Sequence, residues 1–206
     1  MKTQKVFGVG FHRTGTTSLQ TALEVLGYSV VGMRDTEWSA YRQNDLDTIQ
    51  RTVEVFDGFR DMPWPLLYQH LYKAVPNAKF ILTYRDPDDW AKSCAGIYKS
   101  RPYEMFRPIY GFDSFEGNEE KAKEVYLRHI SAVRQFFSDK PDVFLEKDFT
   151  KDHSWQDLCD FLLEPEPDRE FPHANKRPRS LWVKLFHRGY RTAAPGAYKN
   201  WVRDRG

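Results

Sequence analysis

Apolar and polar positions follow two different spacings in successive blocks of this 206-residue chain. Four short blocks are mostly apolar, as in strands buried in a sheet: residues 5–10, 28–31, 79–84 and 143–145. Between them, apolar residues recur every three or four positions, which predicts helices over about 15–27, 36–56, 63–74, 86–98, 126–137 and 155–162. Strands that alternate with helices predict an α/β fold, a three-layer parallel sheet with helices on both faces.

Local signals support two of these helices. Asp86 followed by Pro87 combines a capping carboxylate with a proline at the first helical position. Tyr126, Ile130 and Phe137 mark the core-facing side of a long helix further along the chain.

The segment 8–19, Gly-Val-Gly-Phe-His-Arg-Thr-Gly-Thr-Thr-Ser-Leu, joins the first strand to the first helix. A glycine-rich turn before a helix presents backbone N–H groups and the positive end of the helix dipole to a phosphate. A Walker loop has Lys and then Ser or Thr after its last glycine, but Thr16 and Thr17 stand there. The loop therefore indicates an anion site that is not built for a magnesium nucleoside triphosphate.

A second polar motif follows the strand at 79–84. Arg85 stands where that strand ends, and Ser93 lies eight residues later in the next helix. Ligands of open α/β sheets bind beyond the carboxyl ends of the strands, so we expect Arg85 and the glycine-rich loop to share a crevice. A guanidinium and a hydroxyl make a second anion site. The alternative is that Arg85 pairs locally with Asp86 or Asp89 and Ser93 is solvated.

Composition and charge fit a folded, single-domain protein. The two cysteines, Cys94 and Cys159, have no metal-ligand spacing, and no secretion signal or long apolar run is visible, so a cytoplasmic protein is expected. Residues 173–206 carry nine Lys and Arg against one acid, whereas residues 1–172 carry 22 basic and 28 acidic side chains. We expect an α/β domain over 1–172 and a basic, aromatic extension over 173–206 packed on it. That extension is either a solvated helix pair or a segment that binds phosphates, an acidic substrate or the surface of a membrane.

The loop Arg13-Thr14-Gly15-Thr16-Thr17 and the ordered pair Arg85 and Ser93 together resemble the sulfotransferases that use 3′-phosphoadenosine 5′-phosphosulfate. Further blocks at 11–16, 61–63, 78–87, 155–162 and 171–175 resemble a compact sulfotransferase-like subfamily, and the likeness spans about residues 4–176. The resemblance implies a P-loop-NTPase-like sulfotransferase fold and in-line transfer of a sulfuryl group to a hydroxyl acceptor. It implies no metal.

The resemblance also assigns residues to the donor. The 5′-phosphosulfate falls to Arg13, Thr14, Gly15, Thr16, Thr17 and Ser18, and the 3′-phosphate to Arg85 and Ser93. Arg13 replaces the lysine of the cytosolic enzymes but keeps a charge that can grip a sulfonate. The family's late Arg-Lys-Gly motif is echoed only loosely, by Arg188-Gly189 and the run 196–200.

A hydroxyl acceptor needs a general base, and three places in the sequence can supply one. Asp61 leads because Asp61-Met62-Pro63 matches a block of the subfamily, although it can equally cap a helix. His12 has a suitable ordinary pKa, and can instead bind the sulfonate or pack. Asp35 and Glu37 follow the second strand, where some sulfotransferases carry a catalytic glutamate. With Asp61 and His12, Arg13 completes the expected catalytic set.

Other functions stay open at this stage. A nucleotide kinase or NTPase with a degenerate loop would need a magnesium-binding carboxylate, for which Asp148 is the nearest candidate. A non-catalytic nucleotide-binding protein is a further alternative. A dinucleotide-binding enzyme is the least favoured, because the segment 8–13 lacks the third glycine of the GxGxxG motif. The expected partner is a small molecule or a glycan or lipid hydroxyl, not a nucleic acid. The aromatic residues of 98–115 line a pocket or lid, or belong to the core.

Overall fold

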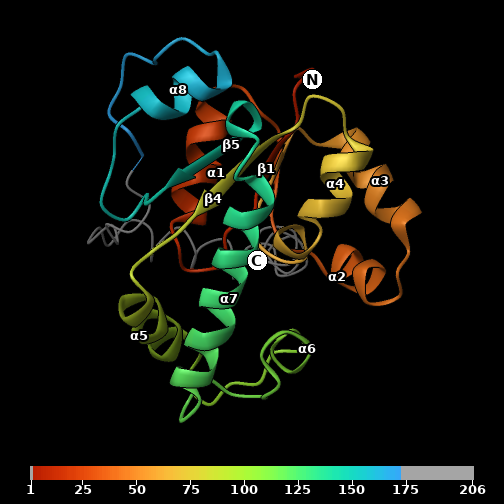
Figure 1. Ribbon diagram of the computed structural model, residues 1–206, viewed down its shortest axis with the longest axis vertical. Coiled ribbons are helices and arrows are strands. Elements are labelled where there is room, and N and C mark those ends of the chain that lie inside the picture. Colours follow the sequence, from red (N-terminus) through yellow and green to blue (C-terminus); the bar gives the residue numbers. More distant parts are fainter. Residues whose placement is uncertain (1, 173–206) are drawn as a thin grey trace, which may run out of the picture.

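The computed structural model describes residues 2–172. Five parallel strands form one sheet in the order β2-β3-β1-β4-β5 (Figure 1). The strands are β1 (Val6–Gly8), β2 (Val30–Val31), β3 (Gly58–Phe59), β4 (Lys79–Thr83) and β5 (Phe144–Lys147). The predicted α/β class and parallel sheet are confirmed. The expected extension over 173–206 lies outside the described residues.

Eight α-helices and two short 3₁₀ turns connect these strands within residues 2–172. The helices are α1 (Thr16–Val25), α2 (Asp35–Arg42), α3 (Leu46–Val55), α4 (Tyr68–Ala74), α5 (Pro87–Tyr98), α6 (Phe106–Tyr110), α7 (Glu119–Phe137) and α8 (Gln156–Leu162). The 3₁₀ turns are η1 (Trp64–Leu66) and η2 (Pro141–Val143). In this part of the chain no helix is long and apolar enough to cross a lipid bilayer.

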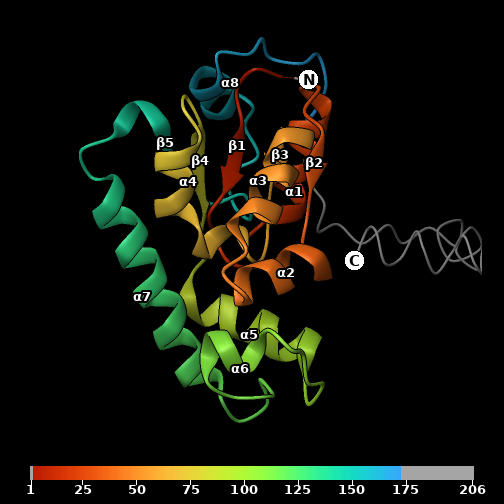
Figure 2. The ribbon, with the colours of Figure 1, turned by 90° about the vertical axis from the view of Figure 1, so that its right-hand side faces the viewer.

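The two faces of the sheet bury two separate apolar clusters, because neighbouring strand residues point to opposite faces. On β4, Phe80 and Leu82 pack with α3, α4 and α7, whereas Ile81 packs with α1 and α8. Helices α5 and α6 lie beyond the carboxyl ends of the strands (Figure 2). They therefore stand at the edge where an open α/β sheet binds its ligands.

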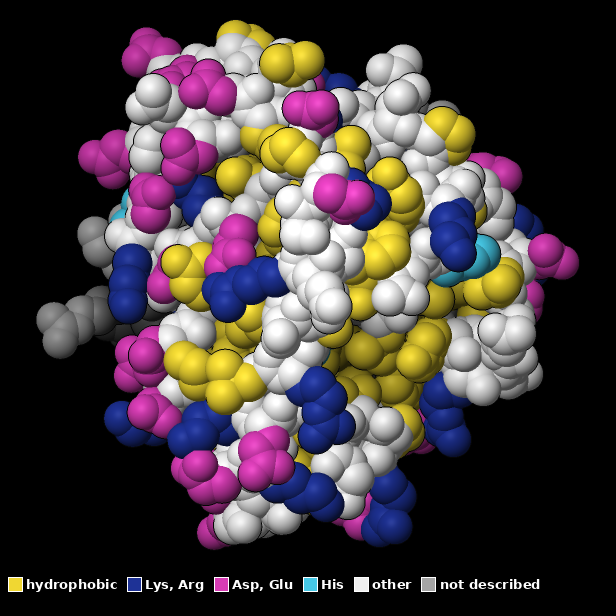
Figure 3. All heavy atoms as spheres, viewed as in Figure 1, with side chains coloured by type: hydrophobic (Ala, Val, Ile, Leu, Met, Phe, Trp, Pro, Cys, Tyr) yellow, Lys and Arg dark blue, Asp and Glu magenta, His cyan; other side chains and the backbone are white. Residues whose placement is uncertain are grey.

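The surface of this domain mixes charges of both signs. On the face seen in Figure 3, basic and acidic side chains are interspersed, and apolar side chains show between them beside α7. Tyr72 of α4 and Phe136 of α7 pack edge to face, with ring centroids 5.5 Å apart. This face therefore shows no broad patch of a single charge.

Several predicted elements are shorter or divided in the structure. The expected helix over 36–56 is two helices, because Asn44 takes a left-handed conformation (φ 55) and the Asp45 carboxylate caps α3 by accepting from Thr48 N. The segment opened by Pro63 is η1 followed by α4. Two elements, β3 and α6, were not predicted. The cap at Asp86 is confirmed, since its side chain accepts from the N–H groups of Asp88 and Asp89.

The aromatic segment after α5 is mostly core. Buried members of this segment are Tyr98, Phe106, Tyr110, Phe112 and Phe115, whereas Tyr103 is 38% exposed. The buried rings pack on one another and on Trp90 of α5. Most of these aromatic residues therefore belong to the core and do not line a pocket or lid.

Gly10 lies where the chain leaves β1 and passes over the end of β4. A Cβ at this position would lie 2.0 Å from the carbonyl oxygen of Thr83 and 2.2 Å from its Oγ1. Neither atom can easily move, because one belongs to the strand backbone and the other is bonded to the Thr14 hydroxyl at 2.6 Å. The close approach of two backbones therefore requires glycine here.

We expect Gly10→Ala to lower the free energy of unfolding by about 3 kcal/mol, because the added methyl group forces the loop away from β4. The matched control is Gly96→Ala in α5, where a Cβ meets nothing within 4 Å. That change should raise stability by about 0.4–1 kcal/mol. Urea unfolding followed by tryptophan fluorescence measures both. Equal stability of Gly10→Ala and the unmodified protein would contradict the close contact.

Candidate functional site

The loop between β1 and α1 lies at the carboxyl edge of the sheet, between the ends of β3 and β4. Its backbone turns through two left-handed residues, Arg13 (φ 66) and Gly15 (φ 94). Left-handed conformations are unfavourable for residues other than glycine, and they cluster at functional sites. Gly15 precedes α1 and offers no side-chain cap. The helix therefore begins with N–H groups that no capping side chain occupies.

Three buried hydrogen bonds fix the loop from beneath. The Thr14 hydroxyl donates to the carbonyl of Phe11 (2.5 Å) and pairs with the Thr83 hydroxyl (2.6 Å). The indole N–H of Trp90 donates to the carbonyl of His12 (2.8 Å). The hydroxyl of Thr14, a residue expected at the donor site, is thus hydrogen-bonded within the protein, so only the backbone of Thr14 is left for a ligand. The loop conformation is held by β4 and α5.

The other loop hydroxyls differ in exposure. Thr16 and Ser18 are buried, whereas Thr17 is exposed at the head of α1. Neither threonine caps the helix through its side chain, since the N-cap residue is Gly15. Capping, the structural alternative for Thr16 and Thr17, therefore does not explain them.

Arg13 extends from the loop to α5. Its Nε donates to the Oγ of Ser93 at 3.0 Å. Among the described residues, the two terminal guanidinium nitrogens of Arg13 have no hydrogen-bond partner. The structure thus places Ser93 beside Arg13, whereas the sequence led us to expect it beside Arg85. The bond to Ser93 of α5 orients the guanidinium through its Nε, and the terminal nitrogens remain available as donors.

Asp61 follows β3 and also has a left-handed backbone (φ 59), next to a cis peptide bond between Met62 and Pro63. Arg60 forms an ion pair with one carboxylate oxygen of Asp61. The other oxygen, Oδ1, is buried and has no hydrogen-bond partner among residues 2–172. A buried carboxylate oxygen with no partner is costly, so its place in the structure points to a ligand group.

His12 is the third candidate, and only 6% of it is exposed. Its Nε2 lies 3.2 Å from the Tyr110 hydroxyl, whereas its Nδ1 is buried with no partner among the described residues. Burial lowers the pKa of His12 to about 4; the charge of Asp61 partly opposes this shift and that of Arg13 adds to it. The imidazole is therefore neutral near pH 7 and lies close to both charged side chains.

The remaining carboxylates do not join these three residues. Burial alone would raise the pKa of Glu37, but hydrogen bonds from Arg34 and Thr52 bring it below its ordinary value. Both oxygens of Glu37 are occupied, so its role is to join α2 to α3. Asp35 is exposed at the start of α2. Asp148, the carboxylate that a kinase would need, accepts from both N–H and hydroxyl of Thr150.

Arg85 lies at the end of β4, and its backbone is fixed by α7. The Tyr126 hydroxyl contacts both the N–H and the carbonyl of Arg85, each at 2.9 Å. The side chain lines a pocket of about 520 Å³ that also contains Lys151 and Lys147, and Lys147 is paired there with Asp152 and Asp157. Among the described residues Arg85 forms no ion pair with Asp86 or Asp89, so the alternative prediction of a local ion pair is wrong. Arg85 therefore offers its charge to the pocket.

Two guanidinium groups flank the same helix. Burial raises the pKa of the Cys94 thiol, and the charges of Arg13 and Arg85 both lower it. Both side chains consequently lie near Cys94 of α5, although the loop itself does not line the Arg85 pocket. That Arg85 and the loop share one crevice stays a prediction.

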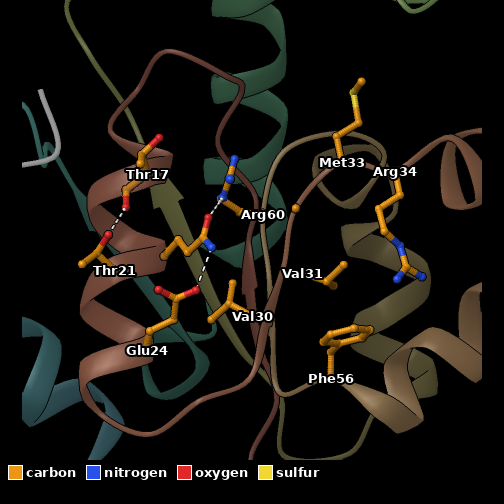
Figure 4. A pocket seen from close by; sticks show the side chains of 11 residues that line it. Thr17, Thr21, Glu24, Val30, Val31, Met33, Arg34, Phe56 and Arg60 are labelled. Carbon is orange, nitrogen blue, oxygen red and sulfur yellow. Dashed lines mark hydrogen bonds between the residues drawn. The ribbon is translucent and has the colours of Figure 1, made fainter. Parts of the chain in front are cut away.

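Another pocket, of about 480 Å³, lies between α1 and the end of β2 (Figure 4). Thr17 and Arg60 lie at one end of it, and Glu24 and Phe56 at the other. Across the pocket wall, Arg60 donates to Gln20 (2.5 Å), and Gln20 donates to Glu24 (2.7 Å). One wall is therefore polar, while Val30, Val31, Met33 and Phe56 make the other apolar.

Sequence reasoning missed two features of this site: the bond from Arg13 to Ser93, and the contact of Tyr110 with His12. The first joins two residues that were both singled out, but for different parts of a ligand. The second involves a tyrosine that had been considered only as part of the aromatic segment. His129 of α7 is partly buried, and its Nε2 is hydrogen-bonded to the Val9 carbonyl at 2.7 Å. No group of three or more potential metal ligands occurs within residues 2–172.

Comparison with known proteins bears on this arrangement. A family model described as a sulfotransferase domain matches residues 5–110 and 100–180. These ranges include the loop, Asp61, Arg85 and Ser93. The chain is also similar to the Ava biosynthesis cluster protein M of Aspergillus versicolor, with 25% identity over 211 residues. That alignment covers 82% of this chain and 80% of the relative.

Proposed function

The chain belongs to the sulfotransferase domain family, and on that premise we propose that it transfers a sulfuryl group from 3′-phosphoadenosine 5′-phosphosulfate to a hydroxyl acceptor. The observation that carries the proposal is that Arg13 and Asp61 both lie close enough to His12 of the loop for their charges to act on its pKa. Arg13 offers free guanidinium donors, and Asp61 offers a buried carboxylate oxygen with no partner among the described residues. An anion and a hydroxyl are the groups that complete such a pair.

The donor fits the loop and the Arg85 pocket. The uncapped N–H groups of α1, with Thr16, Thr17 and Ser18, suit the 5′-phosphosulfate, and the charge of Arg85 suits the 3′-phosphate. Ser93 enters this site through its bond to Arg13. When bound, the donor supplies the sulfuryl group. No step of the proposal requires a metal ion.

The chain's own groups account for the reaction. Asp61 Oδ1 takes the proton of the acceptor hydroxyl. The acceptor oxygen forms a bond to sulfur as the bond between sulfur and the bridging phosphate oxygen breaks, and the bridging oxygen leaves with the nucleotide. Arg60 holds the other carboxylate oxygen and so orients the base. Arg13 and the loop N–H groups are donors fixed in place before the reaction, and they face the charge that develops on the sulfonate and the bridging oxygen.

The acceptor side follows from strand order. Arg85 follows β4 on one side of the loop, and Asp61 follows β3 on the other, so the acceptor approaches from the side of β3 and β2. The pocket between α1 and β2 opens on that side, next to Thr17 and Arg60 (Figure 4). Its polar wall and apolar wall suit a hydroxylated molecule with an apolar part: a small molecule, or the end of a glycan or lipid.

The first experiment is ligand stabilisation. We expect 3′-phosphoadenosine 5′-phosphate, the desulfated donor, to stabilise the protein without metal, by about 2.7 kcal/mol at 100 times its dissociation constant. For a chain of this size that is a rise of about 5–10 °C in Tm, measured by a thermal shift assay. AMP, which lacks the 3′-phosphate, is the matched ligand control. Stronger stabilisation by magnesium ATP, with phosphate release, would overturn the proposal.

Arg85→Ala tests the 3′-phosphate site. Loss of a charge-assisted hydrogen bond costs about 1.5–3 kcal/mol, so we expect affinity for the desulfated donor to fall about 10- to 150-fold. Binding of adenosine 5′-phosphosulfate, which has no 3′-phosphate, should change little. Isothermal titration calorimetry measures both, and Arg51→Ala on the exposed side of α3 controls for loss of charge. Equal weakening of both ligands would place the 3′-phosphate elsewhere.

Asp61→Asn tests the base. Asn keeps the shape of the side chain but cannot take a proton, so turnover should fall about 10²- to 10⁴-fold while affinity for the desulfated donor is unchanged. Turnover is measured with a panel of phenols and alcohols as acceptors, or by donor hydrolysis. Asp35→Asn, an exposed carboxylate at the same edge, is the matched control and should keep full turnover. Normal turnover in Asp61→Asn would remove Asp61 from the role of base.

A further inference from the structure

The imidazole of His12 is enclosed by aromatic side chains of α5 and α6. Its ring centroid lies 5.2 Å from that of Tyr98, 6.0 Å from that of Tyr110 and 6.1 Å from that of Trp90. Tyr110 is 2% exposed, and among residues 2–172 its hydroxyl has one hydrogen-bond partner, the Nε2 of His12 at 3.2 Å. Which of the two side chains donates this hydrogen bond therefore depends on which choice leaves fewer buried polar groups without a partner.

The count of satisfied groups selects one arrangement. A phenol has one proton, and a buried O–H without an acceptor is unfavourable. If the Tyr110 hydroxyl donates to Nε2, the phenol proton is satisfied and the ring proton of His12 sits on Nδ1. If instead Nε2–H donates to Tyr110, the phenol proton and the Nδ1 lone pair are both left without partners. The first arrangement leaves one unpaired group, and the second leaves two.

That single unpaired group is an N–H donor at a site built for an anion. Nδ1 is buried and belongs to the residue directly before Arg13 in the loop. The charged groups that act on the imidazole are Asp61 at the end of β3 and Arg13 in the loop. Among its aromatic neighbours, burial raises the pKa of both Tyr98 and Tyr110, so both hydroxyls keep their protons.

We propose that His12 acts in sulfuryl transfer as a neutral hydrogen-bond donor, through Nδ1–H to an anionic oxygen of the transferred sulfonate, and that Tyr110 is the positioning residue that fixes this tautomer. The inference rests on the proposed function. A nitrogen that already carries its proton cannot accept one from the hydroxyl acceptor, which leaves the role of base to Asp61. His12 and Asp61 thus divide the work between donation and acceptance.

Spectroscopy tests the tautomer without any substrate. In the full chain labelled with ¹⁵N-histidine, we expect His12 to show a protonated Nδ1 and an unprotonated Nε2, unchanged between pH 8 and about 5 because burial lowers its pKa to about 4. His12→Asn identifies the signals by their loss. Tyr110→Phe removes the donor to Nε2 and should shift the population toward Nε2–H. A protonated Nε2 in the unmodified protein, or titration near pH 6.5, would overturn the proposal.

Two amide substitutions test the donor in turnover. Asn places its amide nitrogen near the position of Nδ1, whereas Gln places its amide near Nε2 and leaves Nδ1 without a replacement. Removing one fixed donor of this kind costs about 10²- to 10³-fold in kcat, which we expect for His12→Gln. His12→Asn should retain most of the turnover, and Tyr110→Phe should lower it. Equal losses in His12→Asn and His12→Gln would overturn the donor role.

Affinity for the desulfated donor separates this inference from the proposed function. That ligand has no sulfonate, so His12→Asn, His12→Gln and Tyr110→Phe should all bind it like the unmodified protein, which also shows that the variants fold. If the unmodified protein fails to bind it, the proposed function fails, whatever the tautomer of His12. If binding and transfer are normal but Gln replaces His12 without loss, only this inference fails.

Discussion

The arrangement of the site depends on how the loop after β1 is bonded to its neighbours β4 and α5. The loop begins with a backbone hydrogen bond from Val9 N–H to the Ile81 carbonyl of β4, and its backbone then passes through left-handed positions at Arg13 and Gly15. Buried hydrogen bonds with the Thr83 hydroxyl and from the Trp90 indole hold this part of the loop. The buried side of the loop is thus satisfied by protein, whereas among the described residues no side chain caps the first N–H groups of α1 and the terminal nitrogens of Arg13 have no hydrogen-bond partner.

This division explains why similar side chains have different roles. Thr14 and Thr17 are both loop threonines, yet the first is buried in a hydrogen-bond pair and the second faces a pocket. Likewise Glu37 follows β2 and Asp61 follows the neighbouring strand β3, but of the two only Asp61 keeps a carboxylate oxygen without a partner among the described residues. Burial and hydrogen-bond satisfaction, rather than residue type, separate structural groups from candidate functional groups.

Features encoded locally were predicted well from the sequence. The start of α5 depends on Asp86 and Pro87 alone, and the core face of α7 depends only on its own spacing. Strand β3 escaped prediction because its two residues are strand only through pairing with β1 and β2 on either side.

The site followed the same rule. The loop, Arg85 and Asp61 were singled out from local motifs and family resemblance, and their roles stay predictions. The partner of Ser93 could not be identified, because it depends on how far α5 stands from the loop in three dimensions. The contact of Tyr110 with His12 spans 98 positions in the sequence, and no periodic pattern marks it.

The double contact of Tyr126 with Arg85 has a consequence for the entropy of ligand binding. Because one hydroxyl of α7 holds both the N–H and the carbonyl of this residue, the main chain there is already ordered before any anion arrives. If Arg85 binds a phosphate as proposed, only the bonds of the arginine side chain are immobilised, which costs less than ordering a loop. A long helix on the outside of the fold thus orders the main chain at the end of β4.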